Sequence, residues 1–557
     1  MVLDYKDISF SFKNRKTRRR RQRLKLALLV IALLAVFCGY RFYKLSSAIG
    51  KIQDLLLDNQ VNAAKEKLAN LAFPFFQRGN IRELGALTEL FGDRLPQAEA
   101  QFDKLRLDRT ATSLRSGQFL KCFIDRGEYA KLKIYSDYLL PRGGDENIWY
   151  YALVQAAFFN HGESEHALAR LSPAYKKANA KALAFLFQVN ANLRLGRFDY
   201  IFDRNNSVVA YFDVRKQRTQ SLLPGLDFSD FDRQIKKGAS YFRLTLDAKL
   251  QIEIDRLFTG FFGTLLILDL PQNSILAAYS RPRSPGALNA VFSEAYEPGS
   301  IIKIVSLLAY LRHTDPHVFP YVCSGQIALG GHILYDLLAH KKVNDYGSAL
   351  AMSCNPSFAR MGLAAGFQRL SHVLECFYFN ARPFTDWFLK FQTGTFNRES
   401  RSDFELAKLA TGLGNASLTT VHAAVLAAVF AQNGLYFPPY MIDDAKSILD
   451  LGFYSHGARP LRVLADELNF NRVKKAMQEV VNSENGTGRR AWSAEVNLAI
   501  KTGTAGNSKQ GLDVMVMGFF PAEKPRYAFA FRLEGAGKAE FNGAFFLQRL
   551  LKALLPR

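Results

Sequence analysis

A serine and a lysine three residues apart are the pair in this sequence best suited to nucleophilic chemistry. Ser300 and Lys303 follow Pro298-Gly299 and lead into a dense apolar run, which predicts a buried helix with Ser300 in its first turn. Residues three apart on a helix are neighbours, and burial favours a neutral lysine amine that can take the serine proton. Free backbone N–H groups at the helix start would stabilise an oxyanion. An ordinary capped, buried helix is the alternative, because this spacing also arises by chance.

Two later clusters make chance less plausible. Ser353-Cys354-Asn355 precedes Pro356 and is predicted to occupy a turn, whereas Lys501-Thr502-Gly503-Thr504 ends a predicted strand. Strand alternation puts Thr502 and Thr504 on one face, and Gly503, which lacks a Cβ, allows another backbone or a ligand to approach closely. Each cluster alone has an ordinary explanation, an Asn-Pro turn or a strand end. Ser-x-x-Lys, Ser-x-Asn and Lys-Thr-Gly in helix, loop and strand contexts form a specific joint signal.

The elements that must position these clusters are predicted to be one sheet and a set of helices. Apolar runs at 264–270 and 275–279, joined by Pro-Gln-Asn-Ser, indicate a hairpin that follows a helix capped by Asp247. Helices are expected to dominate from 300 to about 435. Further strands are expected at 498–504, 514–520 and 527–533, and a terminal helix at 544–555. This order predicts an α/β domain over 240–557, with a single antiparallel sheet covered by helices.

The N-terminus combines a basic run with an apolar one. Residues 1–25 contain ten Lys or Arg, and no charge interrupts Leu26–Tyr40, so residues 24–43 are predicted to form one membrane-spanning helix. The positive-inside rule places residues 1–23 in the cytoplasm and the rest of the chain outside. A signal peptide cleaved near Ala48 is the alternative. Arg41 and Lys44 make a poor cleavage region, which favours an uncleaved anchor.

Composition predicts several folded domains, and the positions of the cysteines and histidines do not indicate a metal site. The chain has 557 residues, 48% hydrophobic and 22% charged, and a net charge of +23 that is unevenly distributed and dense in the N-terminal tail. No nucleic-acid partner is expected. The five cysteines, at 38, 122, 323, 354 and 376, show no close pairing, which argues against a metal cluster or a disulfide scaffold, and a Cys323–Cys376 bond stays open. His313 and His317 are separated by Pro316, so the nine histidines are interpreted as structural.

Residues 46–205 have a helical pattern with a weak repeat. Gly127, Gly162 and Gly196, spaced by 35 and 34 residues, each follow an apolar helical stretch, and Asn59 and Gly92 fit two earlier copies. This period resembles the tetratricopeptide repeat, a pair of helices, although a non-repetitive bundle is the alternative. Such a region is expected to bind a partner protein and to contribute no chemistry. Residues 206–239 are interpreted as a linker.

With these motifs in place, residues 240–557 resemble the penicillin-binding protein transpeptidases, the family shared with serine β-lactamases. The likeness extends to Tyr296-Glu297-Pro298 before the serine, Asn289, Gly486-Thr487-Gly488, and Gly518-Phe519-Phe520-Pro521. The resemblance implies a cytoplasmic (inner) membrane enzyme of bacteria with its catalytic domain in the periplasm. Its expected ligands are D-alanyl-D-alanine stem peptides of peptidoglycan and β-lactams, with no cofactor.

The same resemblance implies a role for each motif residue. Ser300 would attack the D-Ala-D-Ala carbonyl, and Lys303 would act as its base. Which lysine, Lys303 or Lys501, activates which serine is the disputed point in this family. Ser353 and Lys501 would relay a proton to the leaving amine, and Asn355 would hold the substrate amide. Thr502 and Thr504, on either side of Gly503, would bind the terminal carboxylate, and the backbone N–H groups of Ser300 and Thr504 would hold the oxyanion.

Departures from the family leave the subtype open. Residues 46–205 do not resemble the glycosyltransferase domain of two-enzyme members, which indicates a class B-like protein, yet class B members usually carry a β-rich pedestal in place of helices. Asp513-Val514-Met515 also replaces a more usual aromatic strand entry. A carboxypeptidase or β-lactamase of the same fold is one alternative function. A β-lactam sensor or scaffold acting through the helical repeats is another.

Overall fold

The structure of this chain is a computed structural model. It describes residues 5–71, 77–106, 114–126, 128–236, 239–283, 289–313, 318–381, 391–399, 402–414, 416–447, 453–455, 461–507 and 511–555. The chain divides into two compact units. The first is Met1–Ala191, and the second comprises Asn192–Ser447 and Gly452–Arg557. Each unit is considered by itself.

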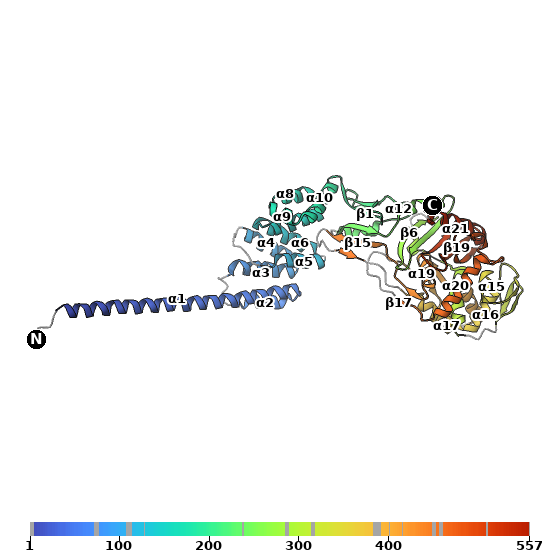
Figure 1. Ribbon diagram of the computed structural model, residues 1–557, viewed down its shortest axis with the longest axis horizontal. Coiled ribbons are helices and arrows are strands. Elements are labelled where there is room, and N and C mark those ends of the chain that lie inside the picture. The colour runs from blue at the N-terminus through green and yellow to red at the C-terminus, as the bar shows by residue number, and fades with distance from the viewer. Residues whose placement is uncertain are drawn as a thin grey trace. The chain divides into compact units, whose positions relative to one another are not determined.

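In the first unit most of the helices pack on the helix that precedes or follows them along the chain (Figure 1). Turns at Asn59 and Gly92 join the first two pairs, and Gly162 lies at the start of α8, directly after the turn that ends α7. Gly127 lies outside the described residues. The helices are α1 (Tyr5–Leu57), α2 (Val61–Ala69), α3 (Arg78–Phe91), α4 (Leu95–Arg106), α5 (Ser116–Arg126), α6 (Tyr129–Leu139), η2 (Leu140–Arg142), α7 (Asp145–Ala157), α8 (His161–Ala169), α9 (Pro173–Ala178) and α10 (Ala180–Arg194).

Aromatic side chains fill the core of this unit. Phe91, Phe102 and Phe123 pack with Tyr135 and Tyr138, all of them buried. The two tyrosine hydroxyls donate to the buried Glu83 carboxylate at 2.9 and 3.2 Å, because a carboxylate removed from water needs hydrogen-bond donors. The helical prediction for 46–205 holds as far as Arg194. Its last repeat marker is wrong, since Gly196 is followed by strand β1 and not by a second helix.

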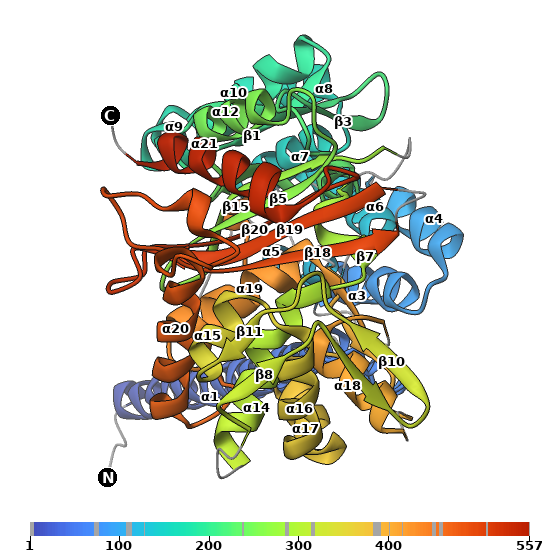
Figure 2. The same ribbon diagram turned by 90° about the vertical axis from the view of Figure 1, so that its right-hand side faces the viewer.

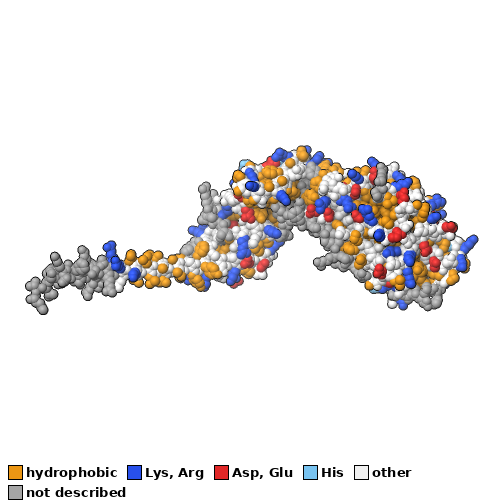
Figure 3. Space-filling view, viewed as in Figure 1, with side chains coloured by type: hydrophobic (Ala, Val, Ile, Leu, Met, Phe, Trp, Pro, Cys, Tyr) orange, Lys and Arg blue, Asp and Glu red, His pale blue; other side chains and the backbone are white. Residues whose placement is uncertain are grey.

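Helix α1 contains the predicted membrane segment and continues beyond it. Its Arg20–Leu57 part has a mean hydropathy of 2.1 over its most apolar 18-residue window, and none of that window is buried. Figure 3 shows this apolar stretch beside basic side chains. Further along, Leu45, Ile49, Ile52 and Leu56 are buried against the helical core. Among the described residues this is the one helix long and apolar enough to cross a membrane.

The second unit contains the predicted antiparallel sheet. Five strands run in the order β18-β19-β20-β5-β6, so β18 lies at one edge. Figure 2 shows α12 and α21 on one side of this sheet and α19 and α20 on the other. The expected hairpin, the three late strands and the terminal helix are all present. Their bounds are α12 (Ala248–Leu257), β5 (Gly263–Asp269), β6 (Ser274–Arg281), α19 (Thr420–Ala431), α20 (Glu467–Asn482), β18 (Ala499–Asn507), β19 (Gly511–Phe520), β20 (Tyr527–Leu533) and α21 (Ala544–Leu554).

Between β6 and α19 the chain forms the helices and short strands that carry two of the three motifs. Helix α14 is apolar along most of its length and packs on α16, α17 and α20, while α15 packs on α20. The elements are α13 (Ala290–Ser293), β7 (Ala295–Tyr296), η4 (Gly299–Ile302), α14 (Lys303–His313), β8 (Tyr321–Cys323), β9 (Gln326–Leu329), β10 (His332–Tyr335), β11 (Lys341–Val343), α15 (Tyr346–Ala351), α16 (Asn355–Ala365), α17 (Phe367–Cys376), β12 (Thr395–Phe396), α18 (Asp403–Thr411) and β13 (Ala416–Thr419). His317 lies outside the described residues.

A second sheet corrects the interpretation of residues 206–239. Strands β2 (Val208–Asp213) and β3 (Arg218–Ser221) lie in this stretch, in a six-stranded sheet of order β16-β15-β4-β1-β2-β3, so it is not a linker. Val209, Ala210 and Phe212 are buried, and they lie in the short apolar run 208–212, whose strand signal the sequence analysis passed over. The remaining elements are β1 (Arg197–Phe202), η3 (Ser229–Phe231), α11 (Asp232–Ile235), β4 (Ala239–Leu244), β14 (Leu435–Tyr436), β15 (Ile442–Ser447), β16 (Phe453–Ser455), β17 (Leu461–Arg462), η5 (Arg489–Ala491) and η6 (Ala539–Gly543).

Candidate active site

Ser300 lies in the short turn η4 that leads directly into α14. Pro298 precedes this turn, and Gly299 has a left-handed φ of +49°. A Cβ on Gly299 would lie 3.0 Å from the carbonyl oxygen of Thr504, so glycine allows the serine turn to approach strand β18 closely. Gly503 has the same role from the strand side, since its Cβ would meet Ile301 at 3.1 Å. The nucleophile therefore sits against the edge strand that carries the Lys-Thr-Gly motif.

Lys303 is fully buried and points toward the Ser-x-Asn turn. Its Nζ donates to the backbone oxygen of Ser353 at 2.6 Å, to Ser353 Oγ at 3.3 Å and to Asn355 Oδ1 at 2.6 Å. The helical spacing predicted that Lys303 contacts Ser300. Within the described residues, its hydrogen bonds go to Ser353 and Asn355 instead. Burial lowers the pKa of Lys303 to about 8, although the negative charges of Asp336 and Cys354 oppose this shift. About a tenth of the amine is therefore neutral at pH 7, far more than for an exposed lysine.

The turn between α15 and α16 holds Ser353 in a left-handed conformation, with φ of +58°. Asn355 begins α16, and its backbone N–H donates to Asp336 Oδ2 at 2.8 Å. Its side-chain amide donates to the Tyr335 carbonyl at 2.9 Å. The sequence predicted a turn with both polar side chains free. The turn is present, but both side chains are held by hydrogen bonds from neighbouring elements.

Lys501 approaches the same serine from the sheet. Its Nζ donates to Ser353 Oγ at 3.0 Å and to the Thr502 carbonyl at 2.7 Å. The side chain is fully buried, and burial together with the nearby Lys303 charge lowers its pKa well below the usual range. Thr502 Oγ1 donates to Thr487 Oγ1 at 2.6 Å, which links the motif to the Gly-Thr-Gly segment noticed in the sequence. The Ser353 hydroxyl therefore lies between two buried amines.

All three motifs meet at one cleft of about 340 Å³. The two lysines lie in its buried wall, and the other predicted residues line it: Ser300, Ser353, Asn355, Thr502, Gly503 and Thr504. A hydroxyl at the cleft surface, two amines depressed in pKa and a bridging serine are the groups needed to deprotonate a nucleophile and to pass a proton onward. The geometry thus suits attack on a carbonyl held along the β18 edge.

An ion-paired arginine behind the cleft escaped the sequence analysis. Arg532 on β20 contacts the Asp513 carboxylate at 2.7 and 2.8 Å and Glu294 Oε1 at 2.8 Å, and it stacks over Tyr296. It fastens the segment that leads to Ser300 to strands β19 and β20. Asp513, noted only as a departure from the family pattern, is therefore the partner in a half-buried ion pair, with the Arg532 and Asp513 side chains 12% and 23% exposed. A lone arginine in a strand gives no sequence signal for such a partner.

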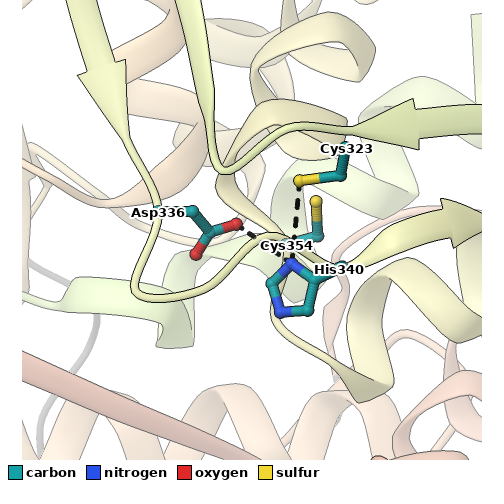
Figure 4. Close-up of side chains that lie close together, drawn as sticks. All are labelled: Cys323, Asp336, His340 and Cys354. Carbon is teal, nitrogen blue, oxygen red and sulfur yellow. Dashed lines mark hydrogen bonds and ion pairs between the residues drawn. The ribbon is translucent and has the colours of Figure 1, made fainter.

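A four-residue group beside the Ser-x-Asn turn was also missed. Figure 4 shows Cys323, Asp336, His340 and Cys354 pointing toward one another, and their ligand atoms all lie within 4.8 Å of one another. These are metal-ligating side chains. The cysteine spacing that argued against a metal cluster was misleading, because the fold brings together residues that are 31 positions apart. All five cysteines are free, so the Cys323–Cys376 disulfide that the sequence left open is absent. Cys323 lies near Cys354 instead.

The fold and the site together define a serine enzyme of the β-lactam-binding class: an antiparallel sheet covered by helices, with a serine at the start of a helix and two buried lysines. The family model described as penicillin binding protein transpeptidase domain matches residues 263–554, just over half of the chain. The chain therefore belongs to the penicillin-binding protein transpeptidase family, and its relatives place it with the class B-like members.

Relatives and solved structures agree with this assignment. Stage V sporulation protein D of Bacillus subtilis is 27% identical over 54% of this chain and 51% of its own length. Peptidoglycan D,D-transpeptidase MrdA of Haemophilus influenzae is 24% identical over 55% of each chain. The chain spans about half the length of these relatives. The fold matches penicillin-binding protein A of Mycobacterium tuberculosis as a penicillin G acyl-enzyme complex, with a TM-score of 0.56 and 18% identity, over 65% of this chain and 100% of that one.

Proposed function

We propose that this protein is a membrane-anchored peptidoglycan D,D-transpeptidase that is acylated at Ser300 by D-Ala-D-Ala stem peptides and binds penicillin covalently at the same residue. The observation that carries the proposal is the position of Ser353 Oγ, 3.3 Å from Lys303 Nζ and 3.0 Å from Lys501 Nζ, in the wall of the cleft that Ser300 lines. Two amines around one hydroxyl provide a proton path that a merely structural pair does not need.

In the proposed mechanism the neutral Lys303 accepts the Ser300 proton as the hydroxyl attacks the carbonyl of the stem peptide. Lys303 already contacts Ser353, so the proton can pass through that hydroxyl, which Lys501 also contacts, to the leaving D-alanine amine. Asn355 holds the substrate amide, and Thr502 and Thr504 hold its carboxylate at the free edge of β18. Backbone N–H groups of Ser300 and Thr504 stabilise the oxyanion. An amine of a second stem peptide then releases the acyl group.

Covalent labelling tests the nucleophile and its base. Incubating the full-length protein with a fluorescent penicillin should label one serine, and peptide mapping should identify Ser300. Ser300→Ala and Lys303→Ala should both lose the label. Ser306→Ala is a matched control, because Ser306 is buried one turn further along and donates to the Ala410 carbonyl, away from the cleft. Labelling that survives in Ser300→Ala would refute the assignment of the nucleophile.

Turnover separates the transferase from the carboxypeptidase or β-lactamase alternative. A hydrolase needs a base that activates water at the acyl-enzyme, but Glu294 is paired with Arg532 and Glu375 with Arg398. Glu297 lines the cleft but is exposed. We expect a stoichiometric burst with a penicillin, followed by very slow release. Sustained hydrolysis would favour the alternative, and its loss in Glu297→Gln would identify the base.

Two features support the proposed membrane anchor: the exposed apolar surface of α1 and the basic residues before it. Residues 1–23 are proposed to be cytoplasmic, 24–43 to span the membrane and the catalytic unit to be periplasmic. Protease added to intact spheroplasts should degrade the catalytic unit and spare the N-terminal tail. A protected catalytic unit would reverse the proposed topology.

The helical unit is proposed to be tetratricopeptide-like and to bind a partner protein, because it consists of successive helix pairs. A shortened chain of residues 192–557 retains both sheets and should still acylate with penicillin while losing the partner. If that chain folds but is not acylated, the proposed division of labour is wrong. A sensor or scaffold would instead bind penicillin but cross-link no peptidoglycan in vitro.

A further inference from the structure

Four side chains with metal-binding atoms converge beside the Ser-x-Asn turn, outside the set that the proposed mechanism uses. Cys323 ends β8, Asp336 follows β10, His340 precedes β11, and Cys354 comes directly before α16. The two cysteines are buried, and the Asp336 and His340 side chains are 4% and 12% exposed. Four separate parts of the chain thus contribute one ligand atom each, at a single point (Figure 4).

The distances within this group are close to those of a tetrahedral site. His340 Nδ1 lies 3.3 Å from Asp336 Oδ2 and 3.8 Å from Cys323 Sγ. Zinc bonds of about 2.0 Å to nitrogen or oxygen and 2.3 Å to sulfur give edges of about 3.3 Å between nitrogen and oxygen and about 3.5 Å between nitrogen and sulfur. The first distance therefore equals the expected edge and the second is slightly longer, and since all four ligand atoms lie within 4.8 Å of one another, small side-chain shifts complete the tetrahedron.

The chemistry of the four ligands selects the kind of metal. Two thiolates, an imidazole and a carboxylate are all ligands that zinc binds in proteins. Calcium and magnesium take oxygen ligands, so a site with two sulfur atoms and one nitrogen does not suit them. Surrounding donors orient the ligands. Ser357 Oγ donates to Cys354 Sγ at 3.1 Å, Gly325 N–H to Cys323 Sγ at 3.4 Å, and Leu337 N–H to Asp336 Oδ1 at 2.8 Å.

We propose that Cys323, Asp336, His340 and Cys354 bind one zinc ion, which fixes the Ser-x-Asn turn in the geometry that acylation needs. Cys354 is the middle residue of that motif, and Asp336 Oδ2 accepts the Asn355 backbone N–H at 2.8 Å. A metal held by both residues braces the turn that places Ser353 between the two lysines. The four ligands are positioning residues, and zinc takes no part in the chemical steps.

Metal content tests the site without reference to catalysis, so its failure is distinguishable from failure of the proposed function. Full-length protein, incubated with zinc chloride and desalted, should retain about one zinc per chain by mass spectrometry. Cys323→Ser and His340→Ala should retain less than about a tenth of that amount. Cys376→Ser is the matched control, since Cys376 is a free, half-buried cysteine on α17 and should keep full zinc. A wild-type protein without zinc, or a Cys323→Ser variant with normal zinc, overturns the site.

Cobalt substitution and thiol counting cover the case in which a variant does not fold. Cobalt(II) in the wild-type protein should show thiolate charge-transfer absorption and the intense visible bands of tetrahedral coordination, as should Cys376→Ser. Zinc should also protect two of the five thiols from alkylation in the folded protein, and a chelator should expose them. Unprotected thiols, an octahedral cobalt spectrum or a Cys323–Cys354 disulfide in the isolated protein would each contradict the proposal.

Acylation kinetics test the positioning role. Removing zinc with a chelator should slow acylation of the wild-type protein by a fluorescent penicillin about tenfold or more, because small displacements of a catalytic turn are costly. Added zinc should restore the rate in the wild type and in Cys376→Ser but not in Cys323→Ser. An unchanged rate in protein shown to be zinc-free would leave a metal site but refute its connection to the active site.

Discussion

Gly412 offers a sharp test of how closely the serine turn must be held, because it touches that turn from a segment outside all three motifs. It follows α18 and has a left-handed φ of +79°. A Cβ at this position would lie 1.9 Å from the carbonyl oxygen of Gly299, next to the nucleophile. An ordinary contact is about 3.4 Å, so in Gly412→Ala the serine turn must retreat by about 1.5 Å.

The expected loss follows from this displacement. A misplacement of about 1 Å at a reacting group can cost about 100-fold in rate, so acylation by a fluorescent penicillin should slow about 100-fold in Gly412→Ala. Gly414→Ala is the matched control. Its φ of +86° imposes the same left-handed strain of about 1–2 kcal/mol, but its Cβ would meet only the flexible end of Lys408, at 3.0 Å.

The assay compares the second-order acylation rate and the melting temperature of the two variants. Both should melt a few degrees below the wild type, and only Gly412→Ala should lose acylation. If both variants are folded and their rates agree within about threefold, the serine turn tolerates the displacement and the reasoning fails.

Two further predictions concern buried charge. The acylation rate should rise through pH 8, where it reaches about half its maximum, and level off about one pH unit higher, because burial lowers the pKa of Lys303 to about 8 and only its neutral form accepts the serine proton. A flat profile between pH 6 and 9 argues against Lys303 as the base. Arg532→Met should lower the free energy of unfolding by about 1–3 kcal/mol, because it removes the partner of Asp513 and Glu294, whose side chains are 23% and 35% exposed. Denaturant titration measures the free energy of unfolding of Arg532→Met, with Arg526→Met, a change at an exposed arginine, as the control. Equal unfolding midpoints of the two variants would contradict the prediction.

The sequence by itself determined the local elements and indicated the residues that we propose carry the chemistry. Short apolar runs joined by turn residues predicted the hairpin of β5 and β6, further apolar runs predicted the strands β18 to β20, and the apolar run after Ser300 predicted α14. These are signals of period 2 or 3.6 within a few residues, which local backbone geometry dictates. The family resemblance rested on the same short motifs, each readable without knowledge of the fold.

The tertiary structure decided which residues meet. The sequence paired Lys303 with Ser300 because they are helical neighbours, whereas the fold directs the amine to Ser353, 50 positions away. Residues 206–239 were interpreted as a linker because polar residues and Pro224-Gly225 interrupt the pattern there, whereas in the fold β2 and β3 extend a sheet that β1 and β4 begin. Cys323 and Cys354 come together only through strand pairing and helix packing. Contacts over such separations depend on topology, and no periodicity in a single sequence records them.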